Sequence, residues 1–156
     1  MTKIIKNIVL FSICLLLSGC YLFSDSRSKV TINLDEMFKN QIALGYIHFG
    51  GEKCQVVRLK PGESFSTLFF PILDSNCHLD FGFNIGNTRY EWASWESELF
   101  KKSFADAFFK QHNRYKIIID LKSDSTLFIR VYQSDGLFSK KLIVQGRDKV
   151  YYRPLE

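Results

Sequence analysis

The chain has 156 residues, 15% of them aromatic, and its 21 Lys and Arg against 16 Asp and Glu give a formal net charge of +5. This length supports one domain with a sizeable core and is too short for two. The 15 Phe are spread along the chain, which argues against disorder. The mild, scattered positive charge indicates a solvated surface, with weak attraction to anionic lipid head groups as the alternative.

A short head with Lys3 and Lys6 precedes an apolar run that closes in Leu17-Ser18-Gly19-Cys20. A positive head, an apolar middle and small residues before a cleavage point are the layout of a secretory signal. The run is short for a membrane-spanning helix, which needs about 20 residues. We therefore expect residues 1–19 to be a signal peptide that is removed. If Cys20 has no role of its own, the alternatives are that it follows an ordinary signal peptide or belongs to a membrane helix.

The Leu17-Ser18-Gly19-Cys20 sequence resembles the lipobox of bacterial lipoproteins. This resemblance implies cleavage between Gly19 and Cys20, a diacylglyceryl group on the Cys20 thiol and an acyl chain on the new amino group, with no other cofactor. In two-membrane bacteria, Asp after the lipidated Cys holds lipoproteins at the inner membrane, and here Tyr21 stands there. The implied location is the outer membrane, lipid-anchored and facing the periplasm, or the outer cell face if there is one membrane. Export excludes nucleic acid as a partner.

Residues 20–28 are the lipidated Cys and a Ser-rich stretch without periodicity, which predicts a flexible tether. Fully extended, such a tether reaches at most about 30 Å. We therefore expect residues 29–156 to form a single β-rich periplasmic domain that works close to the bilayer.

The four cysteines differ in their expected fates. Cys14 leaves with the signal peptide and Cys20 carries the lipid, so Cys54 and Cys77 remain in an oxidising compartment. We expect these two to form a disulfide. A metal site that combines their thiols with His48 or His78 is the alternative, but no close pair with ligand spacing is present, so we expect no metal.

From Lys29 onward the hydrophobic pattern has mainly a period of two, which is typical of strands with one buried face. One strand has the apolar residues Leu79, Phe81, Phe83 and Ile85 on one side and the polar residues His78, Asp80 and Asn84 on the other. The turn signals are Gly50-Gly51, residues 60–63, Gly86-Asn87, residues 122–125 and residues 134–136. The predicted strands are 30–34, 41–49, 52–59, 64–70, 77–85, 115–121, 126–133, 138–145 and 150–153.

One segment has a helical period instead. Its apolar residues recur at spacings of three and four between about residues 95 and 111: Leu99, Phe100, Phe104, Ala107 and Phe108. Ser94 is the expected N-cap, with Glu96 and Glu98 in the first turn. The predicted fold class is therefore mainly β (α+β): an antiparallel β-sandwich or partly open barrel of about eight strands, with one amphipathic helix packed on it.

The sequence contains no motif that holds a nucleophile, a metal or a phosphate at a fixed spacing. His48, His78 and His112 each stand alone in a different predicted element, where an exposed or hydrogen-bonded side chain is the simpler interpretation. We therefore predict no catalytic residue and no enzyme.

The aromatic cluster Tyr90, Trp92 and Trp95 is the candidate binding surface. Tyr and Trp rings can stack on a sugar or on a partner's side chain. Packing of the helix onto the sheet would use the same residues, and alternation favours this core role for Tyr90 and Trp92.

These observations predict a non-enzymatic adaptor that binds another envelope protein through a strand edge or an apolar groove. In layout, a lipobox before a small β-rich domain resembles the accessory lipoproteins of secretion systems, such as pilotins and the sandwich lipoprotein of type VI secretion. The alternative is an immunity or inhibitor lipoprotein that blocks a cell-wall or lipid hydrolase with a loop. Residues 60–63 and 123–126 are the candidate loops.

Overall fold

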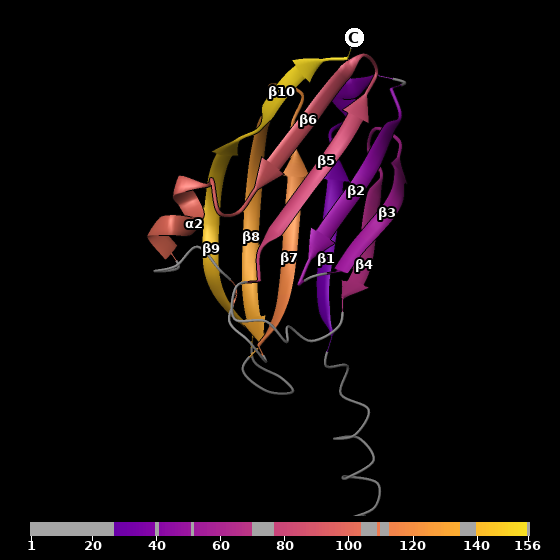
Figure 1. Ribbon diagram of the computed structural model, residues 1–156. Coiled ribbons are helices and arrows are strands. Elements are labelled where there is room, and N and C mark those ends of the chain that lie inside the picture. The colour runs from indigo at the N-terminus through magenta and orange to yellow at the C-terminus, as the bar shows by residue number, and fades with distance from the viewer. Residues whose placement is uncertain are drawn as a thin grey trace, which may run out of the picture.

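The computed structural model describes residues 27–39, 41–50, 52–69, 77–103, 109, 113–134 and 140–155, without the side chains of residues 52–56 and 103. Within these residues ten strands form two five-stranded sheets, which lie face to face (Figure 1). The mainly β prediction is confirmed, and of the two predicted architectures the sandwich is the one found.

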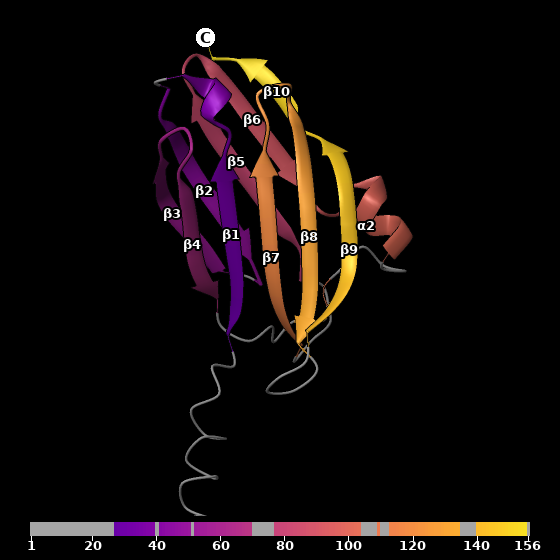
Figure 2. The same cartoon turned by 180° about the vertical axis from the view of Figure 1, so that it is seen from behind.

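Each sheet draws its strands from both halves of the chain, as the two opposite views show (Figures 1 and 2). The first sheet has the order β4 (Ser64–Phe69), β1 (Ser28–Leu34), β7 (Arg114–Leu121), β8 (Thr126–Ser134), β9 (Lys140–Lys149). The second has the order β10 (Tyr151–Pro154), β6 (Thr88–Ala93), β5 (Leu79–Ile85), β2 (Ala43–Phe49), β3 (Glu52–Leu59). Among these strands every pairing is antiparallel except that of β1 with β7.

The chain passes between the sheets at both long sides of the sandwich. On one side, the turn at residues 60–63 leads from edge strand β3 to edge strand β4, with Gly62 at φ +78°. On the other side, buried Val150 alone separates β9 from β10. These two crossings connect the two sheets covalently along both of their edges.

The core lies between the sheets and follows the predicted alternation. Leu79, Phe81, Phe83 and Ile85 of β5 are all buried, and so is every second residue of β7. Burial of these apolar side chains is the main favourable term for folding. Because side chains alternate along a strand, the polar residues between these buried ones point outward. The candidate sites lie on these outer faces.

Within the described residues helix α2 covers Glu98–Ser103, and it begins three residues later than predicted. Phe109, which the sequence placed in the same helix, instead forms a β-bridge with Cys77. The predicted N-cap is also wrong: the Ser97 hydroxyl accepts from the Phe100 N–H, whereas the Ser94 hydroxyl accepts from the Leu79 N–H. A short 3-10 helix, η1, covers Glu36–Phe38. In the described part of the chain, no helix has the length and apolar character needed to cross a membrane.

Candidate functional site

The end of the sandwich opposite to Ser28 gathers four segments that are far apart in the sequence (Figure 2). We call them the distal rim: residues 34–38, residues 60–63, residues 121–126 and Val150. Four backbone hydrogen bonds of 2.9–3.1 Å join them: Gly62 N–H to Leu34 O, Leu34 N–H to Glu63 O, Asp35 N–H to Leu121 O and Val150 N–H to Ser125 O. A fifth, from Lys122 N–H to Thr126 O at 2.9 Å, closes the turn within residues 121–126. The rim is therefore fixed by its backbone before any side chain is considered.

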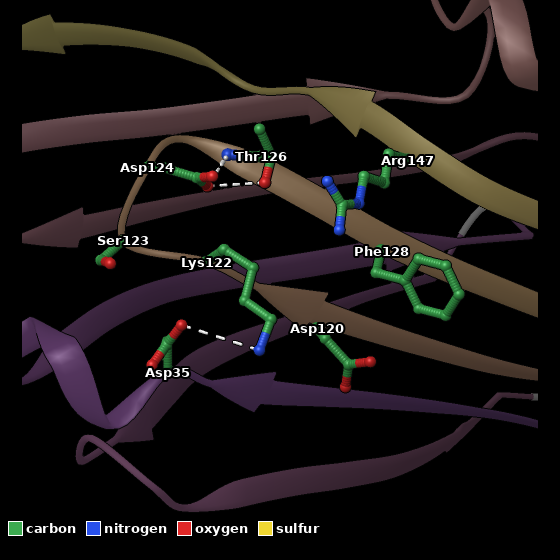
Figure 3. A pocket seen from close by; sticks show the side chains of 8 residues that line it. All are labelled: Asp35, Asp120, Lys122, Ser123, Asp124, Thr126, Phe128 and Arg147. Atoms are coloured by element: carbon green, nitrogen blue, oxygen red, sulfur yellow. Dashed lines mark hydrogen bonds and ion pairs between the residues drawn. The ribbon is translucent and has the colours of Figure 1, made fainter.

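A hollow of about 500 Å³ opens beside the rim on the outer face of the first sheet (Figure 3). Its floor is one cross-strand row, because Asp120, Phe128 and Arg147 lie opposite one another on β7, β8 and β9. The turn between β7 and β8 forms its wall, with Lys122, Ser123, Asp124 and Thr126. Regular strand pairing thus places charged and aromatic groups side by side.

Most charged groups of this hollow are held by neighbours. Lys122 Nζ lies 3.7 Å from Asp35 Oδ2, and Arg130 Nη2 donates to Asp120 Oδ2 at 2.9 Å. The guanidinium of Arg147 differs, because it makes no hydrogen bond or ion pair of contact distance with the residues that the structure describes, and acts on Asp124 only through its charge. Its guanidinium extends beside Phe128 in the hollow (Figure 3), where it is available to an incoming acceptor.

Asp124 is fixed by the turn that contains it. Its carboxylate accepts a hydrogen bond of 2.6 Å from the Thr126 hydroxyl and one of 3.1 Å from the Thr126 N–H. These two donors, the hydroxyl first, hold the pKa of the Asp124 carboxyl below its usual value. The turn therefore presents a fixed negative charge across the hollow from Arg147.

A second hollow of about 370 Å³ lies on the other side of the Asp35–Lys122 pair. It shares Asp35, Asp120 and Lys122 with the first hollow and adds Met37 and Gly62. Met37 is 63% exposed, which is unusual for a large apolar side chain and makes it an accessible contact. The rim thus offers two adjacent concavities with charges of both signs.

The structure gives the three predicted aromatic residues different environments. Trp92 is 3% exposed and its Nε1–H donates to Asp148 Oδ2 at 3.0 Å, so it belongs to the core. Tyr90 is half-buried against Phe38. Trp95, at 40% exposure, lies edge-on to His78. Trp92 and Trp95 line one hollow of about 260 Å³, and Tyr90 is not among the residues that line it.

Two of the three histidines come together although the sequence separates them. The ring centroids of His48 and His78 lie 5.2 Å apart, beside Asp80. The alternation that places His78 and Asp80 on one side of their strand was the only signal for this, and it identifies a cluster with His48 only once β2 is known to pair with β5. His112 lies outside the described residues.

Several predictions concern residues that the structure does not describe. The signal peptide, residues 20–26 with Cys20, and the side chain of Cys54 all fall there. Cys77 is buried just before β5, and Cys54 lies opposite Ile47 in the pairing of β3 with β2. The lipid anchor and the disulfide therefore stay predictions.

Comparison with models of known families, with curated proteins and with solved structures gives no match. Function is therefore inferred from the rim itself. The sequence identified the turns at residues 60–63 and 123–126, but it missed Asp35, Asp120 and Arg147. Their proximity depends on the strand order β1-β7-β8-β9, which no local pattern contains.

Proposed function

We propose that this protein is a lipid-anchored, non-enzymatic binding module of the cell envelope, whose distal rim holds a protruding segment of another envelope protein. The observation that carries the proposal is the joining of two turns, at residues 60–63 and 121–126, to one hydrogen-bonded frame around two hollows. Concave sites with a few fixed polar groups are typical of binding surfaces.

The rigidity of the rim supports binding. A surface already held by backbone hydrogen bonds loses little conformational entropy when a partner docks, so more of the contact energy appears as affinity. Charges of both signs around the hollows give orientation and specificity to the docked segment. Arg147 and Asp124 are the groups that we expect to select it, by pairing with an acidic and a basic group of the partner.

The concave shape favours the adaptor over the inhibitor. An inhibitor of the predicted kind inserts a projecting loop into a hydrolase. The two candidate turns are instead hydrogen-bonded to neighbouring segments, through Gly62 N–H to Leu34 O and through Val150 N–H to Ser125 O. A hollow receives a projection rather than supplying one. We therefore expect the partner to insert into this protein.

The direction of β1 determines where the rim would lie in a domain anchored through Cys20. This strand runs from Ser28 toward the rim over seven residues, which at about 3.3 Å per residue sets the rim about 20 Å beyond Ser28. A lipid on Cys20 would therefore leave the rim at the end away from the bilayer and facing the periplasm. Two or three acyl chains would make this attachment long-lived, because one chain alone binds only marginally.

Site-specific photocrosslinking in intact envelopes tests the function. A photoreactive residue replaces exposed Ser123 or exposed Met37 in the full chain, and the control replaces exposed Lys29 at the opposite end of β1. We expect one discrete adduct with the same envelope protein from both rim positions and none from residue 29. Equal adducts from all three positions, or none from the rim, would contradict the proposal. A secreted hydrolase as the adduct would instead favour the inhibitor.

The anchor is tested separately with Cys20→Ser. Metabolic labelling with a palmitate analogue should mark the wild type and miss the variant, which should stay uncut or become soluble while its fold is unchanged. Equal labelling of the two chains would remove Cys20 from this role.

A further inference from the structure

A second polar cluster lies away from the rim, on the outer face of the second sheet. His48 on β2 and Asp80 on β5 are directly opposite each other, and His78 comes two residues before Asp80. His48 Nδ1 lies 2.9 Å and His78 Nε2 3.4 Å from the same oxygen, Asp80 Oδ1. Two imidazole nitrogens thus lie beside one carboxylate oxygen. A hydrogen bond between one His and Asp80 would not need the second imidazole.

We propose that His48, His78 and Asp80 form a binding site for one divalent transition-metal ion, with Zn²⁺ as its first candidate. The ligand atoms of the three residues all lie within 4.8 Å of one another. Zn²⁺ binds His nitrogen and Asp oxygen at about 2.0–2.2 Å, so two ligands of a tetrahedral ion stand about 3.4 Å apart. The separations of 2.9 and 3.4 Å from Asp80 Oδ1 to the two imidazole nitrogens lie close to this value.

Neighbouring side chains hold the three ligands in place. The Tyr46 hydroxyl hydrogen-bonds to Asp80, as a group around a metal-binding carboxylate commonly does. Trp95 packs edge-on against the His78 ring at a centroid distance of 4.4 Å. Tyr46 and Trp95 are thus positioning residues, one for the carboxylate and one for an imidazole.

The cluster is also accessible. The side chains of His48 and His78 are 29% and 32% exposed, whereas that of Asp80 is 13% exposed. A metal ion can therefore enter from solvent, and a fourth position is left for water. Three protein ligands with one open position are the arrangement of zinc sites that exchange a ligand.

Isothermal titration with ZnCl₂ tests this site in the full chain, purified in detergent and stripped with EDTA. We expect saturable binding of one ion per chain. Removal of an outer partner of a metal ligand costs about 10–100-fold in affinity, so His78→Ala should cost about 100-fold or more and Tyr46→Phe about 10-fold. His112→Ala, the matched histidine control, should bind as the wild type does.

Asp80→Asn is nearly isosteric, so a loss of Zn²⁺ affinity in this variant is not explained by misfolding. Its circular dichroism spectrum should match that of the wild type while its Zn²⁺ affinity falls by about 100-fold. A wild type that binds Zn²⁺ no more tightly than His78→Ala would overturn the proposal and leave a hydrogen-bonded His–Asp–His trio. An equal loss in His112→Ala would overturn it as well.

Discussion

Gly45 and Gly82 show how closely β2 and β5 approach each other at single residues. A Cβ on Gly45 would stand 1.9 Å from the backbone carbonyl oxygen of Gly82, which cannot move aside without breaking the strand pairing. A Cβ on Gly82 would meet Arg89 Nη2 at 2.4 Å and the Tyr46 ring at 2.8 Å, which are the far ends of side chains. The two glycines are therefore required for different reasons.

We expect Gly45→Ala to lower the free energy of unfolding by about 3 kcal/mol or more and Gly82→Ala by only about 1 kcal/mol, because overpacking costs most where backbone must shift. The smaller cost at Gly82 reflects displacement of Arg89 from its hydrogen bonds with Asn84 and Glu91. Urea unfolding of the two variants measures both values. Equal losses would contradict this account.

The Asp124–Thr126 turn gives a pH-dependent prediction. The pKa of Asp124 lies below its ordinary value of 3.8, so its hydrogen bonds stabilise the fold above that pH and are lost as the pH falls through the lower, folded value. Thr126→Val removes the hydroxyl donor. The resulting loss of stability should be constant near neutral pH and shrink below about pH 3.8.

Urea unfolding over a pH series measures this difference, with Asp124→Asn as the matched background. In that background there is no carboxylate to titrate, so the effect of Thr126→Val should not vary with pH. The same acid dependence in both backgrounds would assign the effect to another group.

At the scale of elements, helix α2 depends on Ser97 rather than on Ser94. N-capping hydroxyls contribute about 1 kcal/mol, so we expect Ser97→Ala to lower stability by that amount. Amide hydrogen exchange should lose protection at Phe100, whose N–H donates to Ser97 Oγ. Ser94→Ala should instead expose the Leu79 N–H at the start of β5. Loss of protection at Phe100 in Ser94→Ala would contradict the assignment.

Periodicity predicted strands better than it predicted the helix. Alternation identified all four inward residues of β5 because one face of that strand is buried along its whole length. The predicted helix included Phe109 because its range ran to about residue 111, and spacing cannot show that this residue joins another element. Phe109 is fully buried against Phe49 and Tyr115, and this tertiary contact fixes its backbone beside Cys77.

At the scale of the whole molecule, both candidate sites depend on strand order. The parallel pairing of β1 with β7 joins Asp35 to Leu121, and the pairing of β2 with β5 joins His48 to Asp80. Sequence alternation correctly placed His78 and Asp80 on the polar side of their strand. It could not show which strands are neighbours, because that choice is made by packing of the complete core.

The predicted disulfide also belongs to this scale, because it would tie β3 to the segment before β5. A disulfide contributes about 2–4 kcal/mol, so Cys54→Ser and Cys77→Ser should each lower the melting temperature. The wild type should run faster on a non-reducing gel than either variant. Identical mobility before and after reduction would count against the bond.

The central claim is that the distal rim holds a partner, and Arg147 offers its most direct test. The measurement is the yield of the Ser123 photocrosslink in intact envelopes, in the wild-type background and with Arg147→Glu or Lys29→Glu. Arg147→Glu reverses the charge that Arg147 places in the hollow and should lower the yield about 10-fold, because like charges disfavour docking. Lys29→Glu, at the far end of β1, should leave it unchanged. A yield that is unaffected by Arg147→Glu, or reduced equally by both changes, would contradict the account.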